Sequence, residues 1–354
     1  MPLVAHNDLP TFGKLRQEGL RVLAPGLANQ QDIRELHIGL LNMMPDAALE
    51  ATERQFLRLI GESNPIAQFF VHPFTLDALP RAAAAQAHID KFYDSFEQIK
   101  QQGLDALIIT GANVIGAELA TEVFWEPLIE VADWAHQNVT STLCSCLATH
   151  AVLDFRYGQK RAQQRSKRWG VYRHQVVAPA HPLVAEINSV FDVPHSRWNS
   201  VYREQFEAAG LKVLVTADDG SVHLATSPDG LRSVFFQGHP EYDTVSLLKE
   251  YKRDVNLYIA GELDQYPPMP EHYFSQFGAA IFREYQGRVD KSLRQQAPVP
   301  AFPENLVMES LKNTWQDTAS AVVGRWVGLI YQYTNVDRLK PFMDGVDIDN
   351  PLQL

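Results

Sequence analysis

Short apolar runs alternate with amphipathic stretches along the first 160 residues of the chain. Apolar runs at 37–42, 67–71 and 104–110, and a β-branched run that leads to Cys146, predict buried strands. The second of these is expected to end before Pro73. Between them, apolar side chains recur at helical spacing. Strands that alternate with helices in this way predict an α/β fold with a doubly wound, mainly parallel sheet and flanking helices.

The pattern changes in the second half of the chain. Three strand-like runs at 212–216, 222–225 and 232–237 are separated by the dipeptides Asp219–Gly220 and Asp229–Gly230. Such dipeptides between apolar runs are typical of tight hairpins. We therefore expect an antiparallel meander attached to the parallel sheet.

Composition and charge narrow the class of protein. Hydrophobic residues make up 45% of the 354 positions and charged residues 21%, which is ordinary for a soluble globular protein. The formal net charge of −11 argues against nucleic acid and anionic membranes as partners. No apolar run approaches the ~20 residues of a membrane span, and we expect a cytoplasmic protein. Cys144 and Cys146 are too close to form a disulfide comfortably, which suits a reducing compartment.

Cys146 lies where the pattern switches from strand to helix. A side chain on such a turn is held exposed on a tight bend, as in a nucleophile elbow. It also sits at a helix N-terminus, where the dipole favours a thiolate and free N–H groups can bind an oxyanion. The alternative is a buried structural thiol, since free cysteine often acts as a small hydrophobe. This stretch by itself leaves both interpretations open.

His239 and Glu241 follow the last strand of the meander. They are two residues apart at a strand end, so their side chains can point the same way and form a hydrogen bond. With Cys146 they would form a Cys–His–Glu triad, in which His239 is the base and Glu241 orients it. A lone histidine beside an acid is usually structural. Here all three residues fall on the same predicted edge of the sheet, which favours the triad.

A basic stretch occupies 161–173 of this acidic protein, with Arg161, Arg165, Lys167, Arg168 and Arg173. It could be a solvated surface, or a clamp for a carboxylate or for phosphates. The sequence lacks the HExxH, GxGxxG and P-loop motifs, and its two cysteines have no zinc-ligand company. We therefore expect no metal and no bound cofactor.

Seven motifs together resemble one enzyme family. The chain is similar to the homoserine O-acyltransferases (homoserine O-succinyltransferases), which are related to class I glutamine amidotransferases. The motifs are LLNMMP at 40–45, TERQFLRLI at 52–60, TGA at 110–112, TSTLCSC at 140–146, SKRWGVYRH at 166–174, PHSR at 194–197 and GHPEYD at 238–243.

The resemblance implies an activity and a set of site residues. This family transfers an acyl group from acyl-CoA to the side-chain hydroxyl of L-homoserine, at the start of methionine synthesis. It makes Cys146 the acyl-accepting nucleophile, His239 the base and Glu241 its partner. Backbone N–H groups of Leu147 and Ala112 are expected to hold the oxyanion. The resemblance also implies that Lys167, Ser196 and Arg253 contact the substrate, and that the substrates are small molecules only. We expect a homodimer.

At two positions the chain conflicts with or departs from the family pattern. Helical spacing places Arg253 opposite the apolar stripe of its helix, facing solvent, whereas the resemblance takes it to the substrate carboxylate. His150 replaces the family's usual glutamine, and periodicity points it away from the apolar face of its helix.

The acyl donor depends on residues after the TGA motif. The family's proline is Asn113 here, and Ile115 stands where succinyl-CoA users have glycine and acetyl-CoA users glutamate. Ile115 lacks the charge that would repel a succinyl carboxylate, and Asn113 can donate a hydrogen bond, so we expect succinyl-CoA. The bulk of isoleucine argues for acetyl-CoA. Serine acylation in cysteine synthesis and, more remotely, an amidotransferase-like amidase are the alternatives.

The resemblance also suggests a division of the chain. We expect an amidotransferase-like catalytic domain at 1–265, an insertion or linker of unknown role at 266–312, and a C-terminal helix at 313–354 that packs on the catalytic domain. Periodicity predicts a single helical stretch at 82–100 and one long helix at 305–331.

Overall fold

One twisted sheet runs through the molecule, which we describe from a computed structural model covering residues 3–64, 66–114, 116 and 118–354. In the described part its strand order is β2-β1-β4-β3-β5-β6-β11-β10-β9-β7-β8. The strands are β1 (Leu3–Val4), β2 (Val22–Leu23), β3 (Glu35–Leu41), β4 (Gln68–Phe74), β5 (Ala106–Ile109), β6 (Ser141–Ser145), β7 (Ala162–Val176), β8 (Val190–Ser200), β9 (Lys212–Ala217), β10 (Val222–Thr226) and β11 (Ser233–Phe236).

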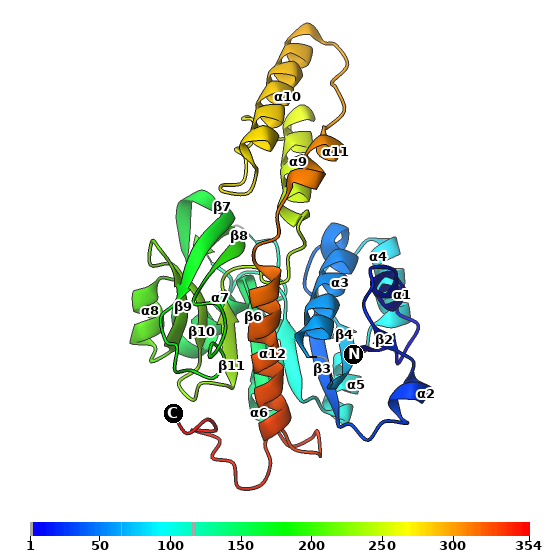
Figure 1. The fold of residues 1–354 in the computed structure, drawn as a ribbon, viewed down its shortest axis with the longest axis vertical. Coiled ribbons are helices and arrows are strands. Elements are labelled where there is room, and N and C mark those ends of the chain that lie inside the picture. Colours follow the sequence, from blue (N-terminus) through cyan, green and yellow to red (C-terminus); the bar gives the residue numbers. More distant parts are fainter. Residues whose placement is uncertain (1–2, 65, 115, 117) are drawn as a thin grey trace.

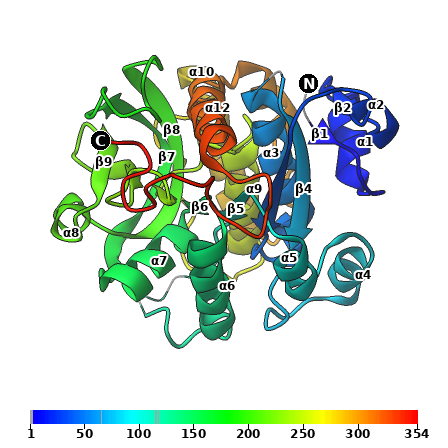
Figure 2. The ribbon, with the colours of Figure 1, turned by 90° about the horizontal axis from the view of Figure 1, so that it is seen from below.

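Helices cover both faces of the sheet (Figures 1 and 2). One face carries α1 (Pro10–Gln17), α3 (Asp46–Ser63) and α12 (Gln316–Tyr333), whose apolar side chains share a core cluster with strand residues. The other carries α5 (Phe96–Gln102), α6 (Trp125–Asn138), α7 (Leu147–Tyr157) and α8 (Arg203–Ala208), which share a second cluster. Two further helices lie near the N-terminal edge, α2 (Pro25–Ala28) and α4 (Ala83–Phe92).

The predicted fold class is confirmed. From β2 to β11 neighbouring strands are parallel, and β11, β10, β9, β7 and β8 then pair in antiparallel fashion. The meander is therefore present, with its last strand joined in parallel to β6. The long β7–β8 hairpin was not predicted. Polar and charged side chains dominate β7, so its sequence lacks the apolar run of a buried strand.

The segment that the sequence left unassigned forms an arm at one end of the sheet. It contains α10 (Gln276–Gln295), α11 (Glu304–Val307) and a 3₁₀ turn (Met308–Ser310), and it packs on α9 (Ser246–Ile259). Phe282 of α10 and Tyr251 of α9 are buried, with ring centroids 5.1 Å apart. Whether the arm is a separate domain stays a prediction, as do the boundaries at 265 and 312.

A backbone bridge ties the arm to β7. Glu271 exchanges hydrogen bonds with Trp169 (N–H to O, 2.8 Å) and Val171 (N–H to O, 2.9 Å), on either side of Gly170. Gly170 has φ of +149°, and a Cβ there would lie 2.2 Å from the carbonyl oxygen of Glu271. Only glycine allows the two backbones to approach this closely.

Three predicted boundaries were wrong. The helix expected at 305–331 is interrupted, and α12 begins at Gln316, because Asn313 Oδ1 accepts from the N–H groups of Trp315 (3.2 Å) and Gln316 (3.0 Å). The stretch 82–100 is divided between α4 and α5 by a capping box at Ser95.

The third error concerns β4, which continues through Pro73 to Phe74. The Phe74 carbonyl faces β3, where it accepts from the N–H of Asn42 (2.9 Å). The preceding Pro73 therefore turns its nitrogen to the opposite side, where the ladder needs no donor.

Helix α12 supports the centre of the sheet. Trp326 is buried, and its Nε1–H donates to Ser141 Oγ of β6 at 2.8 Å. No helix in the described ranges is long and apolar enough to cross a bilayer.

Candidate active site

Cys146 occupies the sharp turn between β6 and α7. Its φ of 51° and ψ of −108° are strained for a residue with a side chain. Strand β6 lies between β5 and β11, and the Cys146 N–H donates to the Phe236 carbonyl at the end of β11 (2.7 Å). The thiol is thus fixed at the carboxyl edge of the parallel strands, where ligands bind in such sheets.

The geometry brings His239 and Glu241 together at the same edge. His239 Nδ1–H donates to Glu241 Oε1 at 2.8 Å, and the His239 N–H donates to the Pro194 carbonyl of β8 (2.8 Å). A Cβ on Gly238 would lie 2.5 Å from Val193 Cγ1, so glycine is required where the chain leaves β11. This arrangement leaves Nε2 of His239 for the Cys146 thiol.

The electrostatics of the thiol and the imidazole are coupled. Burial opposes ionisation of Cys146, but the charge of His239, their hydrogen bond and the charge of Arg197 together lower the pKa of the thiol. Burial opposes the imidazolium too, but Glu241 and the thiolate raise the pKa of His239 well above its usual value. The two directions together favour a thiolate–imidazolium pair at neutral pH. Burial raises the pKa of the neighbouring Cys144 to about 12, so that thiol stays protonated.

A second loop approaches Cys146 from the end of β5. A Cβ on Gly111 would lie 3.5 Å from Cys146 Cβ and 3.9 Å from the nitrogen of Leu147. Leu147 begins α7, where N–H groups have no partner inside the helix. The expected oxyanion donors, Leu147 and Ala112, therefore belong to two segments that meet beside the thiol.

The hairpin β7–β8 brings Lys167 and Ser196 to one carboxylate on α9. Glu250 Oε2 accepts from Lys167 Nζ at 3.2 Å and from Ser196 Oγ at 2.6 Å, while Oε1 accepts from the Tyr242 hydroxyl at 2.7 Å. Burial opposes ionisation of Glu250, but Lys167 and the two hydroxyls lower the pKa of its carboxyl group. The Tyr242 ring stacks on His239 with centroids 4.3 Å apart, which links this cluster to the triad residues.

Arg253 lies one turn after Glu250 on α9. As the helical spacing predicts, it is exposed: 56% of its side chain is accessible, and its guanidinium pairs with Asp254 at 2.7 Å. Burial opposes the charge, but Asp254 and Glu250 raise the pKa of the guanidinium. Residues three apart on a helix share a face, so Arg253 borders the Glu250 cluster from the solvent side. The contact with substrate stays a prediction.

The residues assigned to donor specificity follow Gly111. Asn113 is exposed, whereas Ile115 lies outside the described residues. Arg161 Nη2–H donates to the carbonyl groups of Val114 (3.3 Å) and Gly116.

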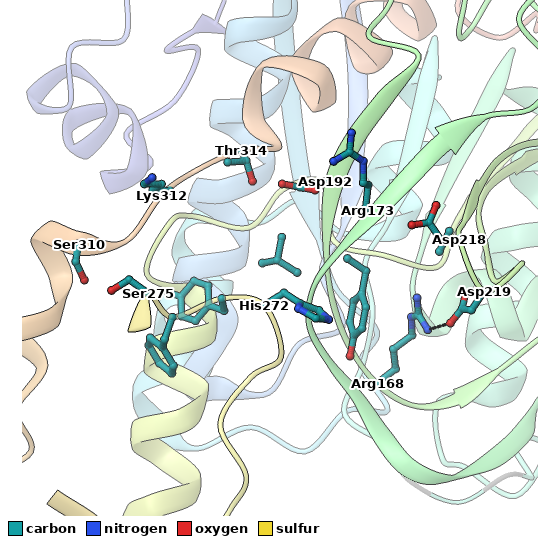
Figure 3. Close-up of a pocket in the computed structure, with 15 residues that line it drawn as sticks. Arg168, Arg173, Asp192, Asp218, Asp219, His272, Ser275, Ser310, Lys312 and Thr314 are labelled. Atoms are coloured by element: carbon teal, nitrogen blue, oxygen red, sulfur yellow. Dashed lines mark hydrogen bonds and ion pairs between the residues drawn. The ribbon is translucent and has the colours of Figure 1, made fainter. Parts of the chain in front are cut away.

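The basic stretch 161–173 does not form one cluster. Successive side chains of β7 point to opposite faces, so Lys167 reaches Glu250 while Arg168 pairs with Asp219. Figure 3 shows Arg168 and Arg173 in a cavity of about 570 Å³ beside the arm. Three basic and three acidic residues line it, so its net charge does not favour phosphates; they are Arg168, Arg173, Lys312, Asp192, Asp218 and Asp219.

His150 contradicts its predicted orientation. It is buried, and its Nε2–H donates to Gln237 Oε1 at 3.0 Å. Periodicity failed here because both faces of α7 are covered near its N-terminus. Burial lowers the pKa of His150 to about 3, so this histidine is neutral.

The sequence also missed the clamp that anchors the GHPEYD loop. Asp243 accepts hydrogen bonds from the guanidinium groups of Arg54 and Arg58 on α3, and Gln55 Nε2–H donates to it at 3.3 Å. This contact joins the TERQFLRLI motif to the loop that carries His239. The helical positions of the two arginines could have suggested a shared partner, but not which one.

Asp243→Asn should loosen the loop. It leaves two largely buried guanidinium groups without their common carboxylate, and we expect a loss of about 1–3 kcal/mol in unfolding free energy. The kcat should fall with little change in KM, because the loop that Asp243 anchors carries His239. Glu18→Gln is the matched control, since Glu18 pairs with the same arginines at the exposed end. Equal kcat values for the two variants would remove Asp243 from the positioning of His239.

Among the described residues, no group of three or more His, Cys, Asp and Glu side chains could hold a metal ion. Cys146, His239 and Glu241 bring a thiol, an imidazole and a carboxylate together, and this set can carry out acyl transfer through a covalent intermediate.

Known proteins resemble this chain over its whole length. The family model described as homoserine O-succinyltransferase matches residues 2–336. The protein named homoserine O-succinyltransferase from Allochromatium vinosum is 62% identical over 354 residues, covering 100% of this chain and 99% of the relative. The protein of the same name from Thiobacillus denitrificans is also 62% identical, over 356 residues and 100% of both chains.

A solved structure, a glutamine amido transferase from Methylobacillus flagellatus, is 13% identical and covers 84% of this chain and 95% of its own. Its TM-score is 0.45. Family membership rests instead on sequence, since the family model and both relatives cover nearly every residue. This chain belongs to the homoserine O-succinyltransferase family.

Proposed function

We propose that this protein transfers the succinyl group of succinyl-CoA to the side-chain hydroxyl of L-homoserine, at the start of methionine biosynthesis, through a thioester on Cys146. The observation that carries the proposal is the strained Cys146 beside the hydrogen-bonded His239–Glu241 pair. The comparison with known proteins also supports this reaction, since two relatives that are 62% identical to this chain are named homoserine O-succinyltransferase.

The first half-reaction loads the enzyme. The Cys146 thiolate attacks the thioester carbonyl of the acyl-CoA, and the oxyanion lies against the N–H groups of Leu147 and Ala112. Collapse of this intermediate breaks the bond to CoA, whose sulfur takes the Nε2 proton of the His239 imidazolium. One thioester replaces another, so the step is close to thermoneutral.

The second half-reaction delivers the acyl group. Neutral His239 removes the proton of the homoserine hydroxyl, and the oxygen attacks the carbonyl of the acyl-cysteine. Collapse releases the ester product and restores the thiolate–imidazolium pair. Glu241 keeps Nδ1 protonated throughout, so that Nε2 is the nitrogen that exchanges protons.

The Glu250 cluster suits an amino acid as acceptor. Lys167 and Glu250 present both signs of charge in a largely buried place, as an ammonium and a carboxylate group require. Ser196 and Tyr242 orient the Glu250 carboxylate, and Arg253 stands at the rim.

The deciding assay measures CoA thiol release with the purified protein, crossing succinyl-CoA and acetyl-CoA with homoserine and serine. We expect the highest kcat/KM for succinyl-CoA with homoserine. A preference for acetyl-CoA would overturn the donor, and a preference for serine would overturn the acceptor. Release of ammonia from glutamine, with no CoA release, would instead establish an amidase.

Arg253→Ala should raise the KM for the amino acid far more than the KM for acyl-CoA. Loss of a charge-assisted bidentate bond to a carboxylate costs about 1.5–3 kcal/mol, which corresponds to roughly a tenfold to hundredfold rise. Steady-state kinetics with each substrate varied in turn measures both constants. An unchanged KM for the amino acid would leave Arg253 as a solvent-exposed partner of Asp254.

The proposal also covers the cellular compartment, the substrates and the cofactors of the enzyme. We place the enzyme in the cytoplasm, where the two cysteines remain reduced, with only small molecules as substrates and no bound cofactor. The homodimer stays a prediction.

A further inference from the structure

Arg197 of β8 is a buried cation without a carboxylate. Only 4% of the residue is exposed, and no ion pair among the described residues includes it. Its Nε–H donates to Ser200 Oγ at 3.1 Å, and Nη1–H donates to the Gln237 carbonyl at 3.2 Å and to His195 Nδ1. Its Nη2 atom is buried and has no hydrogen-bond partner in the part of the chain that the structure describes. A buried unpaired charge is costly, so its position calls for a reason.

Two buried histidines hold this guanidinium in place. Arginine can only donate, so His195 Nδ1 accepts and its Nε2 carries the proton. That Nε2–H donates to His174 Nε2 at 3.1 Å, and His174 Nδ1–H donates to the Tyr172 carbonyl at 2.8 Å. The direction of every bond is set by its two ends, so both imidazoles are neutral with fixed tautomers. Burial lowers the pKa of His195 well below its usual value and that of His174 to about 4, in agreement.

The guanidinium is bonded to the segment that leads from β11 to His239. Gln237, which accepts from Arg197, is two residues before His239 along the chain, and Pro194 of the same strand as Arg197 accepts from the His239 N–H. Burial lowers the pKa of Arg197 to about 10, so it remains charged at neutral pH, and its charge is one of those that lower the pKa of Cys146.

We propose that Arg197 is a positioning residue that keeps Cys146 in the thiolate form, and that the His195–His174 chain exists to fix its guanidinium behind the thiol. The proposal rests on the proposed role of Cys146 as nucleophile. It gives the unpaired charge its partner, because the missing anion is the thiolate itself. Two residues of the PHSR motif would then serve the site: Arg197 supplies a positive charge to the nucleophile, and Ser196 supplies a hydroxyl to the Glu250 cluster.

Other charges also act on Cys146 and must stay constant in a test. They are His239 and Glu241 at the end of β11, the Tyr242 hydroxyl beside them, and Arg161 at the start of the hairpin. Substitutions at Arg197 leave all four in place.

The test compares Arg197→Gln with Arg197→Lys in a Cys144→Ala background. Glutamine can still donate hydrogen bonds but carries no charge, whereas lysine keeps the charge and loses the planar fork. The readouts are the pH dependence of iodoacetamide alkylation, mapped to Cys146 by mass spectrometry, and thiolate absorbance at 240 nm. We expect Arg197→Gln to raise the apparent pKa of the thiol by about 1–3 units. Arg197→Lys should remain close to the parent.

Arg197→Met is a second neutral variant, should glutamine prevent folding, and Arg232→Gln is the remote control, since Arg232 donates to the His136 carbonyl instead. His195→Leu should move the titration in the same direction by less. An unchanged thiol titration in the folded neutral variants would overturn the proposal, as would equal shifts in the Gln and Lys variants. Alkylation needs no acyl donor, so the result stands apart from the CoA-release assay: a titration that depends on Arg197 in a protein without transferase activity would overturn only the proposed function.

Discussion

Cys146→Ala should abolish acyl transfer, with kcat at least ~10⁴-fold below that of the parent, because it removes the thiol whose lowered pKa makes it the nucleophile of the site. Cys146→Ser should be nearly as inactive, since a hydroxyl beside an imidazole is not ionised as this thiol is. Incubation with acyl-CoA alone, followed by intact-protein mass spectrometry, should give one acyl adduct in the parent and none in either variant.

Cys144→Ala is the matched control for this result. Cys144 is two residues before Cys146, within β6, and its thiol is buried in the apolar cluster between the sheet and α6–α7. Its raised pKa, about 12, keeps it protonated and unreactive at neutral pH. We expect near-parental activity and a modest loss of stability from one small cavity. An acyl group on Cys144, or on neither cysteine, would refute the assignment of the nucleophile.

His239→Ala should slow both half-reactions by about 10⁴-fold or more, because one imidazole supplies the proton to CoA and later takes the proton of the hydroxyl. Glu241→Gln should cost about one to two orders of magnitude less, since Glu241 only orients and stabilises the imidazolium. Single-turnover acylation and deacylation of Cys146 measure the two steps separately. Unchanged activity of Glu241→Gln would remove it from the mechanism.

The same pair fixes the pH dependence of acylation. The reactive state needs the thiolate, whose pKa is lowered, and the imidazolium, whose pKa is raised. The rate should therefore fall at acid pH as Cys146 takes up a proton, and at alkaline pH as His239 loses one. In Glu241→Gln the alkaline limb should move to lower pH, because the imidazolium loses its main stabilising charge.

The sequence by itself determined the parts of this protein that depend on neighbours along the chain. The switch of apolar spacing at Cys146 located the turn between β6 and α7. The end of the run at 232–237 located His239 and Glu241, which lie two and four residues beyond it and form the expected hydrogen bond. These predictions worked because strand and helix periods are local, and because the carboxyl ends of parallel strands share one edge.

Only the tertiary structure decided which distant side chains meet. Lys167 and Ser196 lie 83 and 54 residues from Glu250, in a hairpin whose polar strand gave no apolar pattern to detect. The arm packs on α9 through aromatic rings from separate helices, which no local period encodes. In the sequence, Arg197 was one more basic residue of the PHSR motif, with nothing to indicate a role. Its burial, and the histidine chain that holds it, follow from the pairing of the antiparallel strands, because burial and the choice of partner depend on packing and not on spacing along the chain.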